Sequence, residues 1–219
     1  MAQDFYLPYL INYSQPVVED IIIFCVAVLT AIMVSAEGQA IVATLLGDSR
    51  QGATDRFHFN VFLHMSLLGT LCFFIAGFGW AKRIDVDMGR FKKFPVLSLI
   101  LCRFSGPFAN LLMANIAASL AWILGKWGVE DKVFSTIVVV NISVAVYSLL
   151  PITPLPGAAV WSLMGSVSKD WNWLRKYASI LAPYCLVLGF LIIRLSGWDG
   201  VSSFFNPIVL SITSFILHF

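Results

Sequence analysis

Six long apolar segments alternate with short polar stretches along the chain. They lie at about residues 17–46, 59–80, 94–124, 133–150, 179–197 and 201–218. A helix needs about 20 apolar residues to cross the hydrocarbon core of a bilayer, and most of these segments approach or exceed that length. The pattern therefore predicts an all-α integral membrane protein.

The composition supports this prediction. Of the 219 residues, 59% are hydrophobic and 12% are charged, whereas soluble domains carry about 25% charged residues. The net charge is +2, and the basic residues are scattered near loops, so we expect no nucleic-acid partner. No repeat or second domain is evident. We expect one membrane domain over residues 1–219, with a core at about 25–165 and a C-terminal helical pair at 179–219.

Charged residues between the apolar segments predict the orientation. The chain before the first segment has no Lys or Arg, whereas residues 81–93 and 151–178 are basic. The positive-inside rule places these two stretches in the cytoplasm. An N-terminus outside and a C-terminus in the cytoplasm then require five spanning helices and one re-entrant or interfacial segment at 59–80. Six full spans are the alternative, and they leave one basic flank outside.

The basic stretch after the second apolar segment has two interpretations. It either acts only as an orientation signal, or it also binds anionic lipid headgroups or an acidic partner surface. Its basic residues are Lys82, Arg83, Arg90, Lys92 and Lys93.

Polar residues interrupt the first apolar segment. The sequence there reads Ala36-Glu37-Gly38-Gln39-Ala40, followed by Leu46-Gly47-Asp48. In a His-Glu-x-x-His helix, two imidazoles at this spacing hold zinc on one face, and the Glu acts on the bound water. Here alanine occupies both histidine positions, and a methyl group cannot bind a metal.

Two later motifs extend this pattern. One begins at Phe59-Asn60, continues through His64 and Gly69-Thr70 to Phe78–Lys82, and ends with Ser105–Leu112; the other is Ser148–Gly157, which reads SLLPITPLPG. In order and spacing, the three motifs resemble the site-2 protease family of intramembrane zinc metalloproteases over about residues 25–165. The resemblance puts the family's third zinc ligand, an aspartate, at Pro156, and a family asparagine at Ser148.

The resemblance implies a site-2-protease-like core without its metal ligands. Ala36, Ala40 and Pro156 occupy all three ligand positions, so we expect a pseudoprotease, not an enzyme, with no metal and no other cofactor. The alternative is an intramembrane metalloprotease with a rearranged metal site built from Glu37, His58 and His64.

A scaffold of this kind is expected to bind other membrane proteins. We expect a structural or binding subunit of a larger, hetero-oligomeric complex in the bacterial inner membrane, packed against partner transmembrane helices and lipids. The candidate residues for a partner or cavity are Glu37, Gln39, His64, Asn110 and Ser148.

Two of these candidates carry specific expectations. An ionisable group within a membrane helix is costly, so Glu37 either serves proton or ion movement or partner binding, or is a leftover acid kept neutral or solvated. Asn110 follows Ser105-Gly106-Pro107. We expect these small residues to allow close helix packing, and we expect Asn110 to bond carbonyl groups freed by Pro107.

Overall fold

The structure is a computed structural model that describes residues 16–48, 59–129, 131–164, 169–197 and 200–217. Within these ranges the fold is all-helical and contains no strand, although an isolated antiparallel bridge joins Met65 to Ala81. The helices are α1 (Val18–Leu45), α2 (Val61–His64), α3 (Leu67–Ala76), α4 (Pro95–Lys126), α5 (Val133–Tyr147), α6 (Lys169–Ser196) and α7 (Gly200–Leu217), with 3-10 helices η2 (Met88–Arg90) and η3 (Pro156–Met164).

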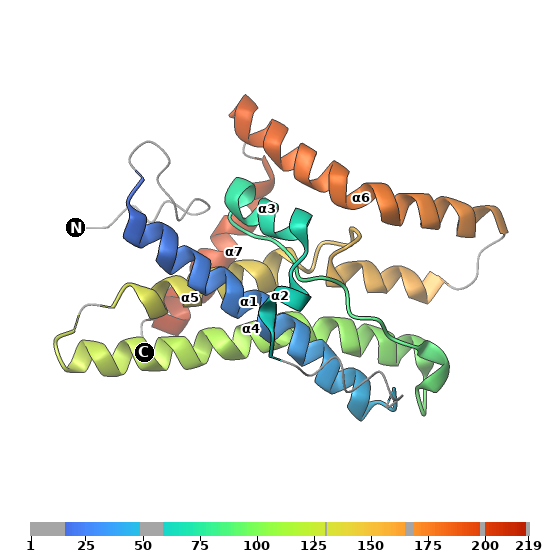
Figure 1. Cartoon of the computed structure of the whole chain (residues 1–219), viewed down its shortest axis with the longest axis horizontal. Coiled ribbons are helices and arrows are strands. Elements are labelled where there is room, and N and C mark those ends of the chain that lie inside the picture. The colour runs from blue at the N-terminus through green and yellow to red at the C-terminus, as the bar shows by residue number, and fades with distance from the viewer. Residues whose placement is uncertain (1–15, 49–58, 130, 165–168, 198–199, 218–219) are drawn as a thin grey trace.

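Helices α1, α4 and α5 pack against one another and form the core. Helix α7 lies against α5, whereas α6 contacts α3 and lies apart from the core along most of its length (Figure 1). The inner face of α1 is built from Phe24, Ala27, Val28, Ala31 and Ile32, each at most 2% exposed. Their spacing of three and four residues puts them on one helix face.

Three of the described helical segments are long and apolar enough to cross a membrane: Val18–Leu45, Pro95–Lys126 and Tyr177–Ser196. The prediction of an all-helical membrane protein is thus confirmed, but the predicted count of about five spans is not. The segment 59–80 forms no single helix, since it contains α2 and α3, with 4 and 10 residues. At 1.5 Å per residue, α3 is about 15 Å long, half the thickness of the hydrocarbon core.

Small residues bring α1 and α4 into close contact, as predicted. A Cβ atom on Gly38 would lie 2.7 Å from the Ala109 Cβ, and one on Gly106 would lie 2.7 Å from the Ser35 Oγ. The prediction for Asn110 is wrong. Its side chain is fully buried, and neither amide atom has a hydrogen-bond partner among the described residues.

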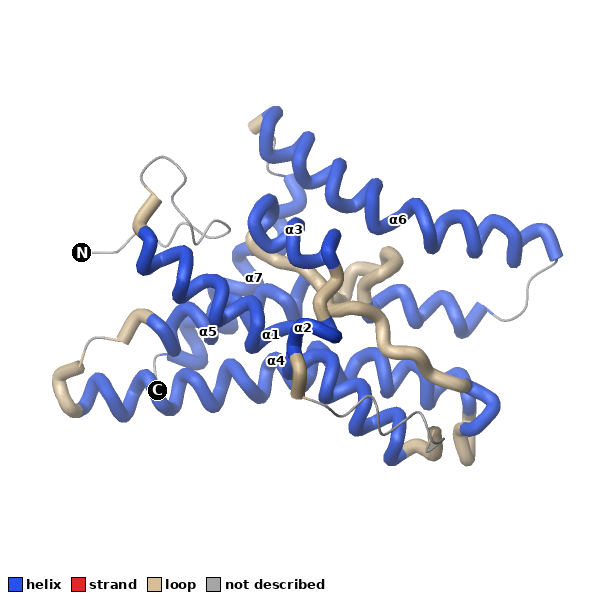
Figure 2. The backbone as a smooth tube through the Cα atoms, viewed as in Figure 1, coloured by secondary structure: helices blue, strands red, loops and turns tan. Residues whose placement is uncertain are grey.

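An extended connection, residues 78–87, leads from α3 toward α4 and appears as a loop in Figure 2. Helix α3 ends at Gly77, whose φ of 75° lies in the left-handed region that glycine adopts readily. The chain then turns back along α2, where the Lys82 N–H donates to the His64 carbonyl at 2.6 Å. Farther on, the Asp87 N–H donates to Asp48 Oδ2 at 3.0 Å. The first bond ties the connection to α2, and the second ties it to the turn that follows α1.

Candidate functional site

The two alanines of the first motif face the extended connection. Ala36 and Ala40 are fully buried on one face of α1 and form an apolar cluster with Ile84, which is 6% exposed. Ile84 therefore fills the space beside the two positions where the resemblance expects histidines.

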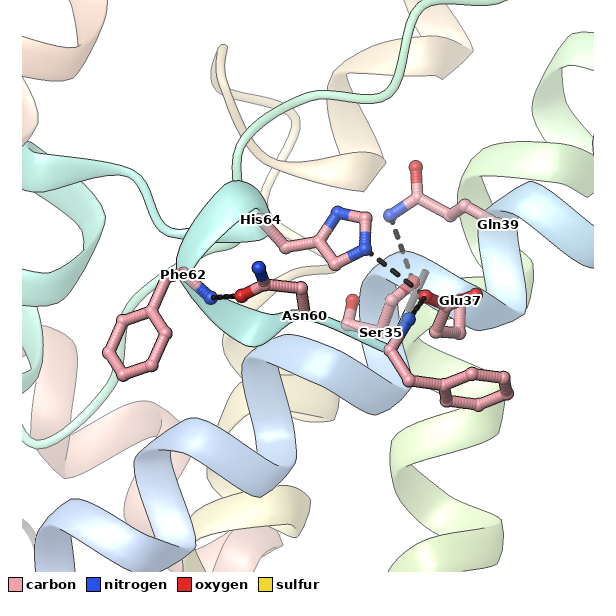
Figure 3. A network of polar contacts seen from close by, with 7 residues as sticks. Ser35, Glu37, Gln39, Asn60, Phe62 and His64 are labelled. Carbon is pink, nitrogen blue, oxygen red and sulfur yellow. Dashed lines mark hydrogen bonds and ion pairs between the residues drawn. The ribbon is translucent and has the colours of Figure 1, made fainter. Parts of the chain in front are cut away.

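Glu37 lies on a neighbouring face of α1 and contacts the chain around α2 (Figure 3). Glu37 Oε1 accepts a hydrogen bond from the Phe59 N–H at 3.1 Å. The His64 Nε2 lies 3.2 Å from the same oxygen, within hydrogen-bond reach if Nε2 carries the proton. The other oxygen, Oε2, is buried and has no partner among the described residues. Glu37 and His64, both predicted as cavity candidates, thus meet.

Local capping explains why His64 reaches Glu37. The Asn60 side chain accepts a hydrogen bond from the Phe62 N–H and caps α2 at its start. The Ser66 side chain does the same for the Gly69 N–H at the start of α3. The short helix between these caps ends at His64 and presents its imidazole to α1.

A small cavity of about 20 Å³ lies against α1 at Ser35 and Gln39, and neither Glu37 nor His64 lines it. It is lined from α1, the extended connection, α4, α5 and the loop that follows α5. The charged and polar residues that line it include Gln39, Arg83, Arg103 and Ser148, and Pro156 lines it as well. The Ser148 Oγ donates to the Ala145 carbonyl at 2.9 Å, which leaves its oxygen able to accept a hydrogen bond.

Arg103 connects three parts of this region. Its Nη1 donates to Gln39 Oε1 at 3.0 Å, and its Nη2 donates to the Ile84 carbonyl at 2.9 Å. The residue is only 6% exposed. The sequence analysis missed Arg103, although an arginine within an apolar helix is a recognisable signal of a functional position.

The remaining predicted residues divide between this region and the surface. Gln39 and Ser148 line the cavity, whereas Asn110 does not. The five basic residues predicted for lipid or interface contact are all exposed, and Arg90 pairs with Asp87 at 3.3 Å. Arg83 also lines the cavity, and neighbouring protein atoms lower the pKa of its guanidinium by displacing water. This group remains cationic at neutral pH.

The described residues do not fit a zinc site. A catalytic zinc takes three protein ligands and one water. Glu37 and His64 supply two donors, while Ala36, Ala40 and Pro156 supply none. Within the described ranges, no group of three or more His, Cys, Asp or Glu side chains could hold a metal ion. His58, a member of the alternative metal site, lies outside these ranges.

Comparisons with known proteins give one informative match. The chain is 34% identical over 127 residues to "Putative zinc metalloprotease YwhC" of Bacillus subtilis (strain 168), a match that covers 54% of this chain and 58% of the relative. The chain therefore matches less than two thirds of that relative. No family model matches the chain, and no solved structure matches it.

The match to this relative bears on two predictions, the family resemblance and the absence of enzyme activity. The similarity supports the resemblance to site-2 proteases. It contradicts the expectation that the chain is not an enzyme, because the relative carries the name of a zinc metalloprotease, which points to a protease. The chain is thus a membrane protein similar to a zinc metalloprotease, in which Glu37 and His64 are in contact and a separate cavity is lined in part by Arg83 and Arg103.

Proposed function

We propose that this chain is a site-2-protease-like membrane protein that binds a transmembrane segment of another integral membrane protein beside its cavity. The observation that carries the proposal is a cavity within the helical core whose lining includes the polar residues Gln39, Arg103 and Ser148. Polar and charged residues at membrane depth are costly, and they commonly mark binding sites or pathways.

The position of the cavity favours a membrane segment as the bound group. Gln39 precedes the last residue of α1, Leu45, by six positions, or about 9 Å along the helix. Arg103 follows the first residue of α4, Pro95, by eight positions, or about 12 Å. Both helices are candidate spans. A group that approaches the cavity from the side of these two helices would therefore come from the bilayer.

The bound segment would belong to a partner in a larger complex of the bacterial inner membrane. In this arrangement the chain has five spanning helices and a re-entrant segment at 59–80, with the N-terminus outside and the C-terminus in the cytoplasm. The short α2 and α3 helices support re-entry, because neither is long enough to span. The exposed basic residues Lys82, Arg83, Arg90, Lys92 and Lys93 would then face anionic lipid headgroups in the cytoplasmic leaflet.

Site-specific cross-linking in native membranes tests the binding. Ile152 is 42% exposed and lies between the cavity residues Ser148 and Pro156, whereas Ile116 is 56% exposed on α4. A photoreactive amino acid at position 152 should form an adduct with a membrane protein, and the same group at position 116 should not. If position 152 gives lipid adducts only, as a lipid-facing position would, the proposal is wrong.

Peptide-bond cleavage of the bound segment is a second candidate function. It is favoured by the name of the relative and by the contact between Glu37 and His64, which are members of the predicted alternative metal site. The described residues alone do not complete that site, so the test is made on the full chain.

Metal content and cleavage of a transmembrane peptide decide this second function. A protease with a rearranged metal site should hold about one zinc per chain. His64→Ala should remove the zinc and the cleavage, whereas the control His218→Ala should keep both. Substoichiometric zinc that is unchanged in His64→Ala would contradict a metal site at this pair.

A further inference from the structure

Helix α6 contacts the rest of the molecule mainly through its second half. It packs against α3, whereas its first turns lie apart from the core (Figure 1). Among the α6 side chains that the structure describes, the buried ones are Leu186 and Val187, in the second half, whereas Tyr177 and Ile180 in the first half are exposed. The placement of α6 therefore depends on contacts near its C-terminal end, and two of these converge on the end of α3.

The first of these contacts is a cap that Arg194 places on α3. Its Nη1 donates to the carbonyls of Phe74 and Ile75, at 3.0 and 2.8 Å. The last four carbonyls of a helix have no partner within that helix. In α3 the Gly77 N–H donates to the Phe73 carbonyl at 3.0 Å, and Arg194 satisfies the next two carbonyls. Its positive charge also lies at the negative end of the α3 dipole.

The second contact lies on the other side of the Gly77 turn. Phe190 meets Phe78 edge-on, with ring centroids 5.0 Å apart, and Phe78 directly follows Gly77 in the chain. Phe190 and Arg194 are four positions apart, so they share one face of α6. These two residues, termed the α6 clamp, therefore contact the chain immediately before and immediately after the turn.

The turn held by the α6 clamp is the start of the extended connection. The connection continues to Arg83, which lines the cavity, and to Ile84, which packs against Ala36 and Ala40. Its backbone is tied to α2 by the bond from the Lys82 N–H to the His64 carbonyl. The path from the clamp to the cavity is thus a short run of extended backbone.

We propose that the α6 clamp is a conformational device that holds the end of α3 and, through the extended connection, couples α6 to the cavity. Arg194 acts as a positioning residue, because it contacts neither the cavity nor the Glu37–His64 pair. A displacement of α6 would release the α3 carbonyls and loosen the connection that carries Arg83. The device does not depend on what the cavity binds.

The reactivity of Cys72 tests the cap. Cys72 on α3 and Cys102 on α4 are both fully buried, so Cys102 serves as an internal reference. The full chain in detergent micelles is treated with N-ethylmaleimide, and mass spectrometry follows each cysteine separately. Arg194→Leu should raise the labelling rate of Cys72 about tenfold through local opening of α3, the scale of one hydrogen bond to a charged group. The rate at Cys102 should not change.

Two further variants assign the effect to the guanidinium group. Arg194→Lys should raise the rate at Cys72 by less, because an ammonium keeps the charge but not the forked donors. This variant is decisive if Arg194→Leu does not fold. The matched control is Ile192→Ala, since Ile192 is 64% exposed on the same helix, and it should leave the rate at Cys72 unchanged.

Hydrogen exchange over residues 78–87 tests the coupling to the cavity. The amides of this stretch, including that of Lys82, should exchange faster in Arg194→Leu than in Ile192→Ala. Faster labelling of Cys72 without faster exchange in this stretch would overturn the coupling. Unchanged labelling in both Arg194 variants would overturn the cap, and so would an equal rise at Cys102, which would indicate a general loss of stability.

These outcomes are separate from those of the proposed function. Cross-linking at position 152 reports whether a membrane segment binds, whereas cysteine labelling and hydrogen exchange report how α6 is attached. Failure of the clamp would leave segment binding in place, and failure of segment binding would leave the clamp in place.

Discussion

Two glycines determine how closely the first and fourth helices approach. Gly38 on α1 faces Ala109 on α4, and Gly106 on α4 faces Ser35 on α1. Membrane helices gain association energy mainly from van der Waals packing and interhelical hydrogen bonds, so close approach matters more than apolar character. The short separation also places Gln39 within reach of Arg103.

We expect Gly38→Ala to destabilise the protein by about 1–3 kcal/mol, the usual cost of overpacking. The added methyl would lie 2.7 Å from the Ala109 Cβ and 3.1 Å from the Ser105 carbonyl oxygen. Gly125→Ala on the same helix pair is the control, because a Cβ there meets nothing within 4 Å. It should be neutral or stabilise by about 0.5 kcal/mol through helix propensity. Unfolding by SDS titration in detergent micelles measures both, and equal stability of the two variants would contradict the close contact.

At the scale of elements, the extended connection brings the site together. It places Ile84 against Ala36 and Ala40, and it brings Arg83 to the cavity. Its course depends on Gly79, because a Cβ there would lie 2.1 Å from the Gly69 carbonyl oxygen. The apolar content of residues 59–80 does not reveal that the chain turns back on itself here. The sequence alone therefore could not decide how many helices span the membrane.

Some features of the site could be predicted and others could not. Glu37 and His64 were both singled out from motifs, and the structure brings them to 3.2 Å. The role of Arg103 depends on Gln39 and Ile84, which lie 64 and 19 positions away in the chain. No local pattern encodes contacts over such separations. The Asn110 prediction failed for a related reason: Pro107 frees a carbonyl group nearby, but the geometry of the buried amide depends on tertiary packing.

At the scale of the whole molecule, one aromatic cluster joins the C-terminal helices to the core. Phe78 stacks on Tyr147 of α5 with ring centroids 4.1 Å apart, and it meets Phe190 of α6 edge-on at 5.0 Å. Tyr147 in turn contacts Phe205 of α7 and lies within hydrogen-bond distance of Asn206. The extended connection, α5, α6 and α7 therefore meet at a single point.

Phe78→Ala should weaken this junction. Phe78 is fully buried, and truncation of a buried Phe costs about 3–5 kcal/mol in soluble proteins. We expect the free energy of unfolding to fall by about 3 kcal/mol here. In a membrane, lipid replaces water around the unfolded helices, so moving the side chain out of the core costs less, but the loss of packing contacts remains. Phe108→Ala is the matched control, because Phe108 is 61% exposed on α4. Thermal unfolding in detergent compares them, and a similar loss for both variants would place Phe78 outside the junction.

The contact of Ile84 with the two alanines has an evolutionary consequence. A variant with a histidine at position 36 or 40 would have to fit an imidazole into space that Ile84 already fills. The first such change would therefore destabilise this packing, and selection would act against it. Related sequences with histidines at these two positions should accordingly carry a smaller residue at position 84, or a different course of the chain around it. Positions 36, 40 and 84 should change together during the divergence of these sequences.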